Sequence, residues 1–350
     1  MKNLTAIVLV SISLFSCKQE KTKTVVNPET GKTETVVIPE NAENMDTVPK
    51  ADYAIKDSAG VYKQKFNLEK GQTYPFVSYQ KNVTLMTDPS GKSLTGTQET
   101  TDEMSFKVND MVNGIYDITI NLSAKRIASS SNGQTKVVDT KLSAPAAAEL
   151  KSVWSINKAM TGTTLNMKMD SEGKIISITG FEPIYKKVEA AVASSIKDPK
   201  QKAQFSAGLK QSFNEKSISE QFSKNLLLLP KNGVKIGQSW TKSENLSPDG
   251  KLKLTTTYTL AKVENGVAEI RTKGGVPLKS DKMTQQGITQ TMSIEGSQSG
   301  LLKYDAITGW ILTGTENMTT MQKETVSDGK KSQSMTQKST ITASVNPSYK

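Results

Sequence analysis

The sequence predicts a mainly β protein, with curved antiparallel sheets arranged as an incomplete barrel or a sandwich. Three observations lead to this fold class. Apolar and polar residues alternate with a period of two, tight-turn dipeptides separate the alternating stretches, and the pattern of the first half recurs in the second. One segment, at about residues 183–229, instead has the spacing of a helical insert. The 350 residues are enough for one large domain or two.

The amino terminus matches the pattern of a lipoprotein signal peptide over residues 1–16. A positive start at Lys2 precedes an apolar stretch at residues 6–15, which is too short to cross a bilayer of about 30 Å as a helix. The sequence LFSC at residues 14–17 resembles the bacterial lipobox, and this resemblance implies cleavage before Cys17 and attachment of lipid to its thiol. We therefore expect a membrane anchor at Cys17. The alternative is an ordinary secretory signal followed by an incidental cysteine.

Two details narrow the role and location of this cysteine. Cys17 is the only cysteine in the chain, so no disulfide can form within it. Lys18 stands where inner-membrane lipoproteins of enterobacteria carry aspartate, and this favours the outer membrane, on its periplasmic or its cell-surface face.

Residues 17–60 match the pattern of a flexible tether. KTKTVVNPE at 21–29 recurs as KTETVVIPE at 32–40, proline ends each Thr-Val-Val run, and few large apolar side chains are available to bury. Two Asp-Ser/Thr-apolar triplets resemble O-glycosylation sites of Bacteroidota, and they make Thr47 and Ser58 the candidate O-glycosylation residues.

Residues 61–180 form the predicted first β half, and residues 231–350 form the second. Alternation at residues 104–108 and 252–260 is typical of half-buried antiparallel strands. Asn-Gly and Asp-Gly pairs lie between the alternating stretches, and they supply the positive φ angles that tight hairpins need. The sequence therefore predicts a meander of antiparallel strands in each half.

Three ordered correspondences indicate that the two halves are a duplication. They are LEKGQTY (68–74) with VKIGQSW (234–240), FKVNDMVNGIYDI (106–118) with YTLAKVENGVAEI (258–270), and MDSEGKII (169–176) with YDAITGWI (304–311).

The insert at residues 181–230 is expected to hold three helices. Pro183 suits the first position of one helix, Asp198 the cap of the next, and residues 217–220 a capping box for the third. Each helix has one apolar face, which either packs into the core or forms a lid over an apolar cavity. The candidate ligand contacts of such a lid are Phe205, Leu209, Phe213, Phe222 and Leu226.

The body of the chain resembles an uncharacterised family of Bacteroidota lipoproteins, a domain of unknown function of about 300 residues. NLEKGQTY, LLLLPKNGVKIGQSW and GLLKYDAITGW carry the resemblance, which extends over roughly residues 60–345. It implies a lipoprotein with a β-rich body, and it implies no catalytic residues.

The residue inventory argues against an enzyme. The chain has no histidine, which removes the commonest general base and the commonest zinc ligand, and we expect neither a cofactor nor a metal site. Paired carboxylates could still make a glycosidase. The candidates lie mostly in or beside expected turns, where a structural role is the simpler explanation: Asp102, Glu103, Asp170, Glu172 and Asp305.

The expected function is therefore binding. The net charge of +11 comes almost entirely from lysine, without the arginine and aromatic clusters of nucleic-acid readers, so no nucleic-acid partner is expected. The leading hypothesis is a non-enzymatic envelope lipoprotein that binds an apolar or amphipathic, lipid-like ligand or an envelope protein. The alternatives are a surface glycan-binding lipoprotein, in which Trp154, Trp240 and Trp310 would have to be exposed together, and a purely structural envelope protein.

Overall fold

The structure is a computed structural model, which describes residues 22–26, 33–37, 53–226, 228–247 and 250–347. The chain divides into two units, residues 1–48 and 49–350. In the first unit, β1 (Thr22–Val26) pairs antiparallel with β2 (Thr33–Val37), so the repeated Thr-Val-Val runs of the predicted tether are strands. The predicted signal peptide, Cys17 and Thr47 lie outside the described residues.

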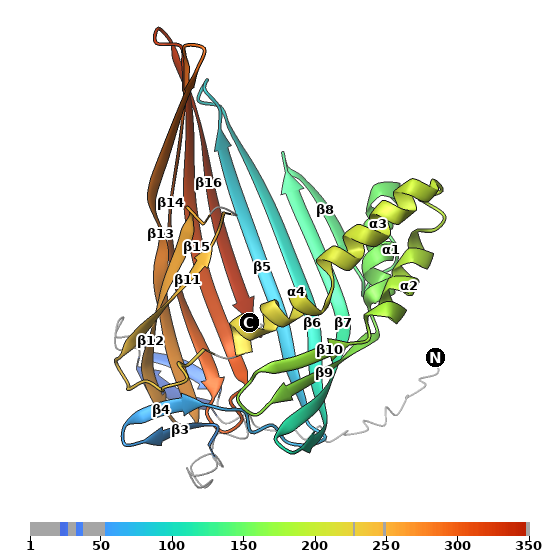
Figure 1. Cartoon of the computed structure of the whole chain (residues 1–350), viewed down its shortest axis with the longest axis vertical. Coiled ribbons are helices and arrows are strands. Elements are labelled where there is room, and N and C mark those ends of the chain that lie inside the picture. Colours follow the sequence, from blue (N-terminus) through green and yellow to red (C-terminus); the bar gives the residue numbers. More distant parts are fainter. Residues whose placement is uncertain (1–21, 27–32, 38–52, 227, 248–249, 348–350) are drawn as a thin grey trace, which may run out of the picture. The chain divides into compact units, whose positions relative to one another are not determined.

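The second unit is built on one antiparallel sheet of 12 strands that does not close on itself (Figure 1). The strand order is β10-β9-β7-β6-β5-β16-β15-β14-β13-β12-β11, and β8 pairs with β7 beside this path. A smaller sheet pairs β3 with β4. The prediction of a mainly β, antiparallel protein with a helical insert is confirmed, and the single unclosed sheet corresponds to the incomplete barrel rather than to the sandwich.

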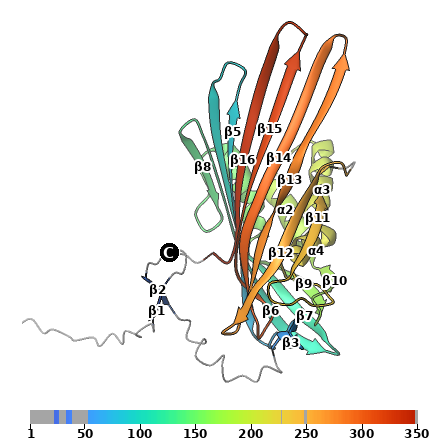
Figure 2. The same cartoon turned by 90° about the vertical axis from the view of Figure 1, so that its left-hand side faces the viewer.

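The strands vary from short pieces to ribbons that continue past the helices (Figures 1 and 2). Before the first long helix the strands are β3 (Ile55–Ser58), β4 (Val61–Gln64), β5 (Thr73–Thr87), β6 (Ser93–Val112), β7 (Ile115–Ser131) and β8 (Gln134–Asp139). The later strands are β9 (Thr163–Asp170), β10 (Ile175–Thr179), β11 (Ser239–Asn245), β12 (Lys253–Glu264), β13 (Val267–Gln285), β14 (Ile288–Asp305), β15 (Ile311–Ser327) and β16 (Ser332–Val345).

The sequence correspondences between the halves fall at equivalent places in the sheet. Strands β5, β6, β7, β9 and β10 neighbour one another in the same order as β11, β12, β13, β14 and β15. In each half an Asn-Gly turn joins the second strand to the third, with φ of 52° at Asn113 and 50° at Asn265. Just before that turn the pairing shifts register, after Val108 in one half and after Leu260 in the other.

The hydrogen bonds that surround this hairpin repeat as well. The amide of Gly71 donates to the carbonyl of Val108 over 2.8 Å, and the amide of Gly237 donates to the carbonyl of Leu260 over the same distance. These geometric matches support the internal duplication inferred from the sequence. Strand β16 has no counterpart, and it joins the two sets by pairing with both β15 and β5.

Four helices pack on one side of the sheet (Figures 1 and 2). They are α1 (Ala148–Met160), α2 (Phe181–Val192), α3 (Pro199–Ser212) and α4 (Glu215–Leu226). The insert therefore has the three helices expected at residues 181–230. Helix α1 was missed, because it lies within the predicted first β half. The local signal for this helix is its run of strong helix formers, AELK, at its start.

The structure corrects two of the three predicted helix caps. Helix α2 begins at Phe181 after Gly180, whose φ is 101°, so Pro183 is its third residue rather than its first. The predicted cap of α3 is confirmed, since the Asp198 carboxylate accepts the amide of Gln201 over 2.8 Å. The capping box of α4 lies one turn earlier than expected: the amide of Ser217 donates to the Asn214 side chain over 3.0 Å, and the amide of Asn214 donates to the Ser217 hydroxyl over 3.1 Å.

The folded body begins before residue 61. Ile55 in β3 is 1% exposed, and its amide donates to the carbonyl of Ala306 over 2.8 Å, so the last part of the predicted tether belongs to the core. Ser58, the second candidate glycosylation residue, lies at the exposed end of β3. Its modification remains a prediction.

A buried glutamine, Gln64, links strand β4 to the end of the helical insert through hydrogen bonds. The Gln64 side-chain amide donates to the carbonyls of Leu226 and Gly309, over 2.9 and 3.2 Å. Its side-chain oxygen accepts the amides of Leu228 and Leu229, over 3.1 and 3.3 Å. These bonds satisfy a polar group that would otherwise be costly to bury, and they hold Leu226, Leu228 and Leu229 against β4.

Candidate functional site

An apolar pocket of about 180 Å³ lies between the helices and the first half of the sheet. Strands β6, β7 and β9 contribute its floor, and α1, α4 and the α3–α4 junction contribute its walls. Its apolar lining consists of Met104, Ile120, Leu122, Ala124, Met160, Leu165, Phe213, Ile218 and Phe222. Polar residues border it, namely Asp102, Glu103, Lys125, Asn157, Thr161 and Gln221. The site thus combines an apolar interior with a charged margin.

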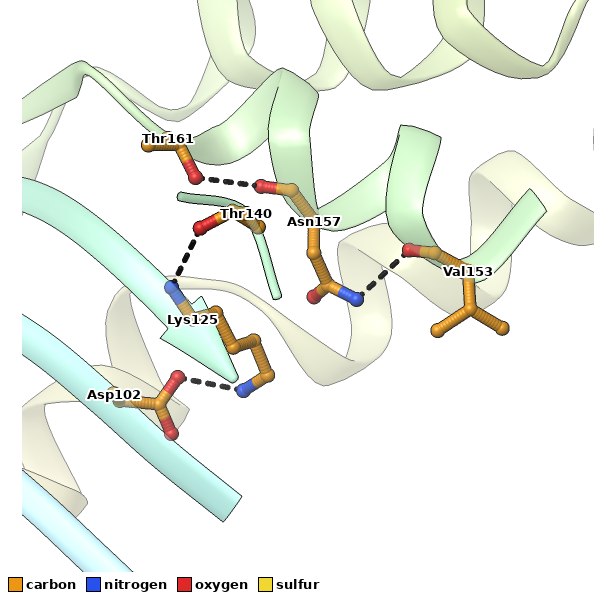
Figure 3. A network of polar contacts seen from close by, with 6 residues as sticks. All are labelled: Asp102, Lys125, Thr140, Val153, Asn157 and Thr161. Atoms are coloured by element: carbon orange, nitrogen blue, oxygen red, sulfur yellow. Dashed lines mark hydrogen bonds and ion pairs between the residues drawn. The ribbon is translucent and has the colours of Figure 1, made fainter. Parts of the chain in front are cut away.

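An ion pair and a set of hydrogen bonds fix the polar margin (Figure 3). The Lys125 ammonium lies 2.6 Å from the Asp102 carboxylate, and both side chains are about one-third exposed. The backbone amide of Lys125 donates to the Thr140 hydroxyl over 2.9 Å. On α1, the Asn157 side chain donates to the carbonyl of Val153 over 2.8 Å, and the Thr161 hydroxyl donates to the carbonyl of Asn157 over 3.0 Å.

The five candidate lid residues take three different positions. Phe213 is partly buried and lines the pocket, as a ligand contact should. Phe222 also lines it, but Phe222 and Leu226 are each 1% exposed and belong to the core of the body. Phe205 and Leu209 on α3 are partly buried against the core and lie outside the pocket lining. The insert therefore packs into the core and also contributes a wall of the pocket, and its action as a lid stays a prediction.

Several pocket residues were not singled out as site residues from the sequence. Met104 belongs to the alternating pattern and was assigned to a buried strand face, but nothing in that pattern distinguishes a pocket wall from ordinary core. The pairing of Asp102 with Lys125 depends on a register shift between β6 and β7, after Glu103. No local sequence signal reports such a cross-strand contact.

The volume of the pocket limits what can enter it. Sites for drug-sized ligands usually measure about 300–1,000 Å³, whereas an apolar cavity of about 150 Å³ can hold a benzene molecule. At about 180 Å³, this pocket has room for one compact apolar group and not for a whole lipid. A ligand would thus place one such group inside and keep the rest at the margin.

The carboxylates that were considered for catalysis have structural partners. Glu103 lies 2.6 Å from the Lys141 ammonium, and Glu172 lies 3.9 Å from the Lys65 ammonium. Asp170 accepts the amides of Glu172 and Lys174 in a turn, and Asp305 accepts the amide of Ile307. Asp170 and Asp305 thus serve turns, as expected, whereas Asp102 and Glu103 line the pocket, and the absence of catalysis stays a prediction.

The three tryptophans occupy separate environments. Trp310 is 3% exposed, and its indole nitrogen donates to the carbonyl of Pro75 over 3.1 Å. Trp154 on α1 donates to the carbonyl of Asp139 over 3.0 Å. Trp240 on β11 stacks on Tyr258, with ring centroids 5.7 Å apart. Trp310 is thus a core residue, as expected, and it cannot share an exposed platform with the other two.

In the second half of the sheet, a carboxyl group lies in a largely buried cluster. The Thr256 hydroxyl donates to the side-chain oxygen of Gln298 over 3.3 Å, and the Gln298 amide donates to Glu316 over 3.3 Å. Burial raises the pKa of the Glu316 carboxyl above its ordinary value, although the hydrogen bond from Gln298 acts in the opposite direction. The fully buried Tyr304 has its own pKa raised by burial.

The raised pKa of Glu316 predicts a stability that depends on pH. The folded state favours the protonated carboxyl, so this contribution is complete below the unfolded value of about 4.3 and is lost as the pH rises through the folded value. We expect Glu316→Gln to raise Tm at pH 7 by about 2 °C and to leave it unchanged at pH 4. Thermal unfolding at both pH values measures this, with Glu295→Gln, at an exposed position on β14, as control. An equal shift at both pH values would show that ionisation is not the cause.

Two further properties concern the part of the chain that the structure describes. None of the helices in that part of the chain is both long and apolar enough to span a bilayer. Within the same residues, no three acidic, cysteine or histidine side chains gather where they could ligate a metal ion.

Comparisons with known proteins place the chain in a family. A solved structure of lipid–protein interactions in lipovitellin matches with a TM-score of 0.35 and 10% identity, over 79% of this chain and 25% of that chain. The COG4313 outer membrane channel from Pseudomonas putida F1 matches with a TM-score of 0.17 and 8% identity, over 83% of this chain and 99% of that one. No curated protein sequence matches. A family model does match residues 113–311, which is more than half of the chain. This span is shorter than the roughly 60–345 over which the sequence resembles an uncharacterised family. The chain therefore belongs to the family of unknown function DUF6263.

Proposed function

We propose that this protein is a non-enzymatic lipoprotein of the bacterial outer membrane that binds an amphipathic ligand in the pocket between the helices and the sheet. The observation that carries the binding proposal is the pocket itself, with its apolar lining and its Asp102–Lys125 ion pair at the margin. The membrane address rests on the lipobox resemblance at Cys17. The ligand is a small molecule or an exposed group of an envelope protein.

The lining explains why an amphipathic ligand fits best. Burying each methylene of a ligand contributes about 0.8 kcal/mol, and the apolar side chains from the sheet and helices offer no polar partner inside. At the margin, Lys125 and Asp102 remain about one-third exposed and can bond to a polar group.

Narrowing the pocket should weaken binding of an apolar probe. We expect Leu122→Trp to reduce the affinity for N-phenyl-1-naphthylamine about tenfold, equivalent to about 1.4 kcal/mol, because the larger ring occupies the space between β7 and the helices. Fluorescence titration of the full chain measures this. Leu209→Trp is the matched control, since Leu209 is also partly buried against the core but lies outside the pocket lining.

Three outcomes of that titration decide the binding proposal. A loss confined to Leu122→Trp, with less than about a twofold change for Leu209→Trp, supports it. Equal losses of affinity in both variants would show that the substitutions act through a general effect on packing and not through the pocket. An unaltered protein that does not bind the probe at all would overturn the proposal.

The membrane address has a separate test. Because the lipobox resemblance implies acylation of the Cys17 thiol, Cys17→Ser should abolish incorporation of labelled palmitate and release the protein from the membrane fraction of the cell. Lys18→Ala is the control, since it leaves the thiol in place. Normal palmitate incorporation by Cys17→Ser would rule out the anchor while leaving the pocket proposal intact.

A further inference from the structure

A second and larger hollow, of about 1,000 Å³, lies on the other half of the sheet. Its side chains come mostly from alternate residues of β12, β13, β14 and β15. Thr272 and Gln298 also line it, but most of the lining belongs to one set of alternate positions that includes Thr257, Arg271, Lys273, Ser299 and Thr319. In β13 these residues alternate with Ile270 and Thr272, both at most 4% exposed, so the hollow lies on the face opposite the core. We call it the outer hollow.

The outer hollow holds two cations, and no carboxylate is among the residues that line it. Each residue that lines it is neutral or cationic. Arg271 and Lys273 are exposed, and within the described part of the chain neither forms an ion pair. Their cross-strand neighbours are neutral: Arg271 lies between Thr259 and Leu301 in the pairing register.

Some other cations on the sheet have carboxylate partners. The chain has only two arginines, and the other one, Arg126, lies 3.6 Å from the Glu99 carboxylate. Lys81 lies 3.1 Å from the same carboxylate, and Lys303 lies 3.2 Å from Glu269. Ion pairs thus neutralise several of the sheet's cations, and Arg271 and Lys273 are not among them.

The duplication supplies a comparison within the molecule. By the aligned hairpins, Arg271 and Lys273 correspond to Thr119 and Asn121 of the first half. There the two residues are neutral, and they are hydrogen bonded along the sheet, with Thr119 accepting from Asn109 over 2.9 Å. The sheet geometry at these positions therefore does not need cations, and their presence is specific to the second half.

We infer that the outer hollow binds a ligand that carries sulfate, phosphate or carboxylate groups. A guanidinium binds such oxyanions through two parallel hydrogen bonds, and an ammonium beside it adds a point charge. Hydroxyls from Thr257, Ser299 and Thr319 can donate to further oxygens. The lining has no aromatic side chain on which a neutral sugar ring could stack, so charge rather than stacking would select the ligand.

The size of the hollow admits two sources for the oxyanion, a free ion or an anionic oligosaccharide. Calorimetric titration of the full chain distinguishes them with three probes: inorganic phosphate, a sulfated hexasaccharide and neutral maltohexaose. We expect binding of at least one of the two anionic probes, weakened by added salt because the site is exposed. Phosphate binding alone assigns the site to free oxyanions, and binding of the hexasaccharide alone assigns it to the anionic sugar.

A pair of matched double variants tests the location. Arg271→Gln with Lys273→Gln should reduce the affinity at least about tenfold. Lys279→Gln with Lys282→Gln removes the same charge from exposed positions of the same strand outside the hollow, and it should change the affinity less than about twofold. Equal losses of affinity in the two double variants would mean that the anionic probe is attracted by the general positive charge of the protein. Binding of neutral maltohexaose as strong as that of the anionic probe would mean that charge does not select the ligand. Either result, or no binding of any probe, overturns the inference.

This inference is independent of the pocket under the helices. Leu122 lies on the first half of the sheet and does not line the outer hollow. Leu122→Trp should therefore leave binding of the anionic probe unchanged.

Discussion

Replacing Phe222 with alanine is expected to lower the free energy of unfolding by about 3–5 kcal/mol. Phe222 lies on α4, is 1% exposed, and packs in the core between α4 and the sheet. Its ring lies 5.7 Å from that of Phe76 and 4.9 Å from that of Phe106, both in edge-to-face geometry. The alanine variant would lose these ring contacts and leave a cavity where helix and sheet meet.

Urea unfolding of the full chain measures this loss as a lower midpoint at constant slope. Phe205→Ala is the matched control, because Phe205 is also a helical phenylalanine of the insert but is only partly buried. We expect it to cost about 1 kcal/mol. If the two variants cost the same, the helices contribute through their surface contacts rather than through the aromatic cluster, and the role of Phe222 in the core is wrong.

Gly274→Ala is expected to cost about 3 kcal/mol, at the upper end of the range for overpacking. A Cβ atom at this position would lie 2.1 Å from the carbonyl oxygen of Thr255 and 2.8 Å from the Cα of Thr256. These are backbone atoms of the neighbouring strand β12, so no side-chain rotation can relieve the contact. The strands would have to separate where the outer hollow has its floor.

Gly96→Ala is the control for this prediction. Gly96 is also a strand glycine of the same sheet, in β6, but an added Cβ atom there meets nothing within 4 Å. We expect a change within about 0.5 kcal/mol, because the site is open and alanine needs no unusual backbone angle. Similar thermal stability of the two variants would show that the tight strand contact at Gly274 relaxes easily.

Some parts of the candidate site followed from the sequence. Alternation placed Met104 and Leu122 on an inward-facing strand surface, and helical spacing placed Phe213 and Phe222 on the apolar faces of the insert. The sequence could not say that these surfaces meet around a pocket, because that depends on how far α4 lies from the sheet. It also could not separate Phe213 from Phe205, since both have the same local spacing.

The outer hollow was also beyond the reach of the sequence alone. Arg271 and Lys273 are two residues of an ordinary alternating strand, and the local pattern does not mark them as a binding site. Their lack of a carboxylate partner is visible only from the pairing register with β12 and β14. Cross-strand neighbours come from distant parts of the chain, so local patterns do not report them.

By itself the sequence determined the antiparallel strands, the Asn-Gly hairpins, the duplicated halves and the helical insert, because each follows from local periodicity or from turn chemistry at neighbouring residues. Only the tertiary structure decided that both halves join one open sheet through β16, that α1 adds a wall to the pocket, and that Arg271 and Lys273 share a hollow. The physical reason is that these features depend on pairing register and on packing distances between segments far apart in the chain, which local sequence does not encode.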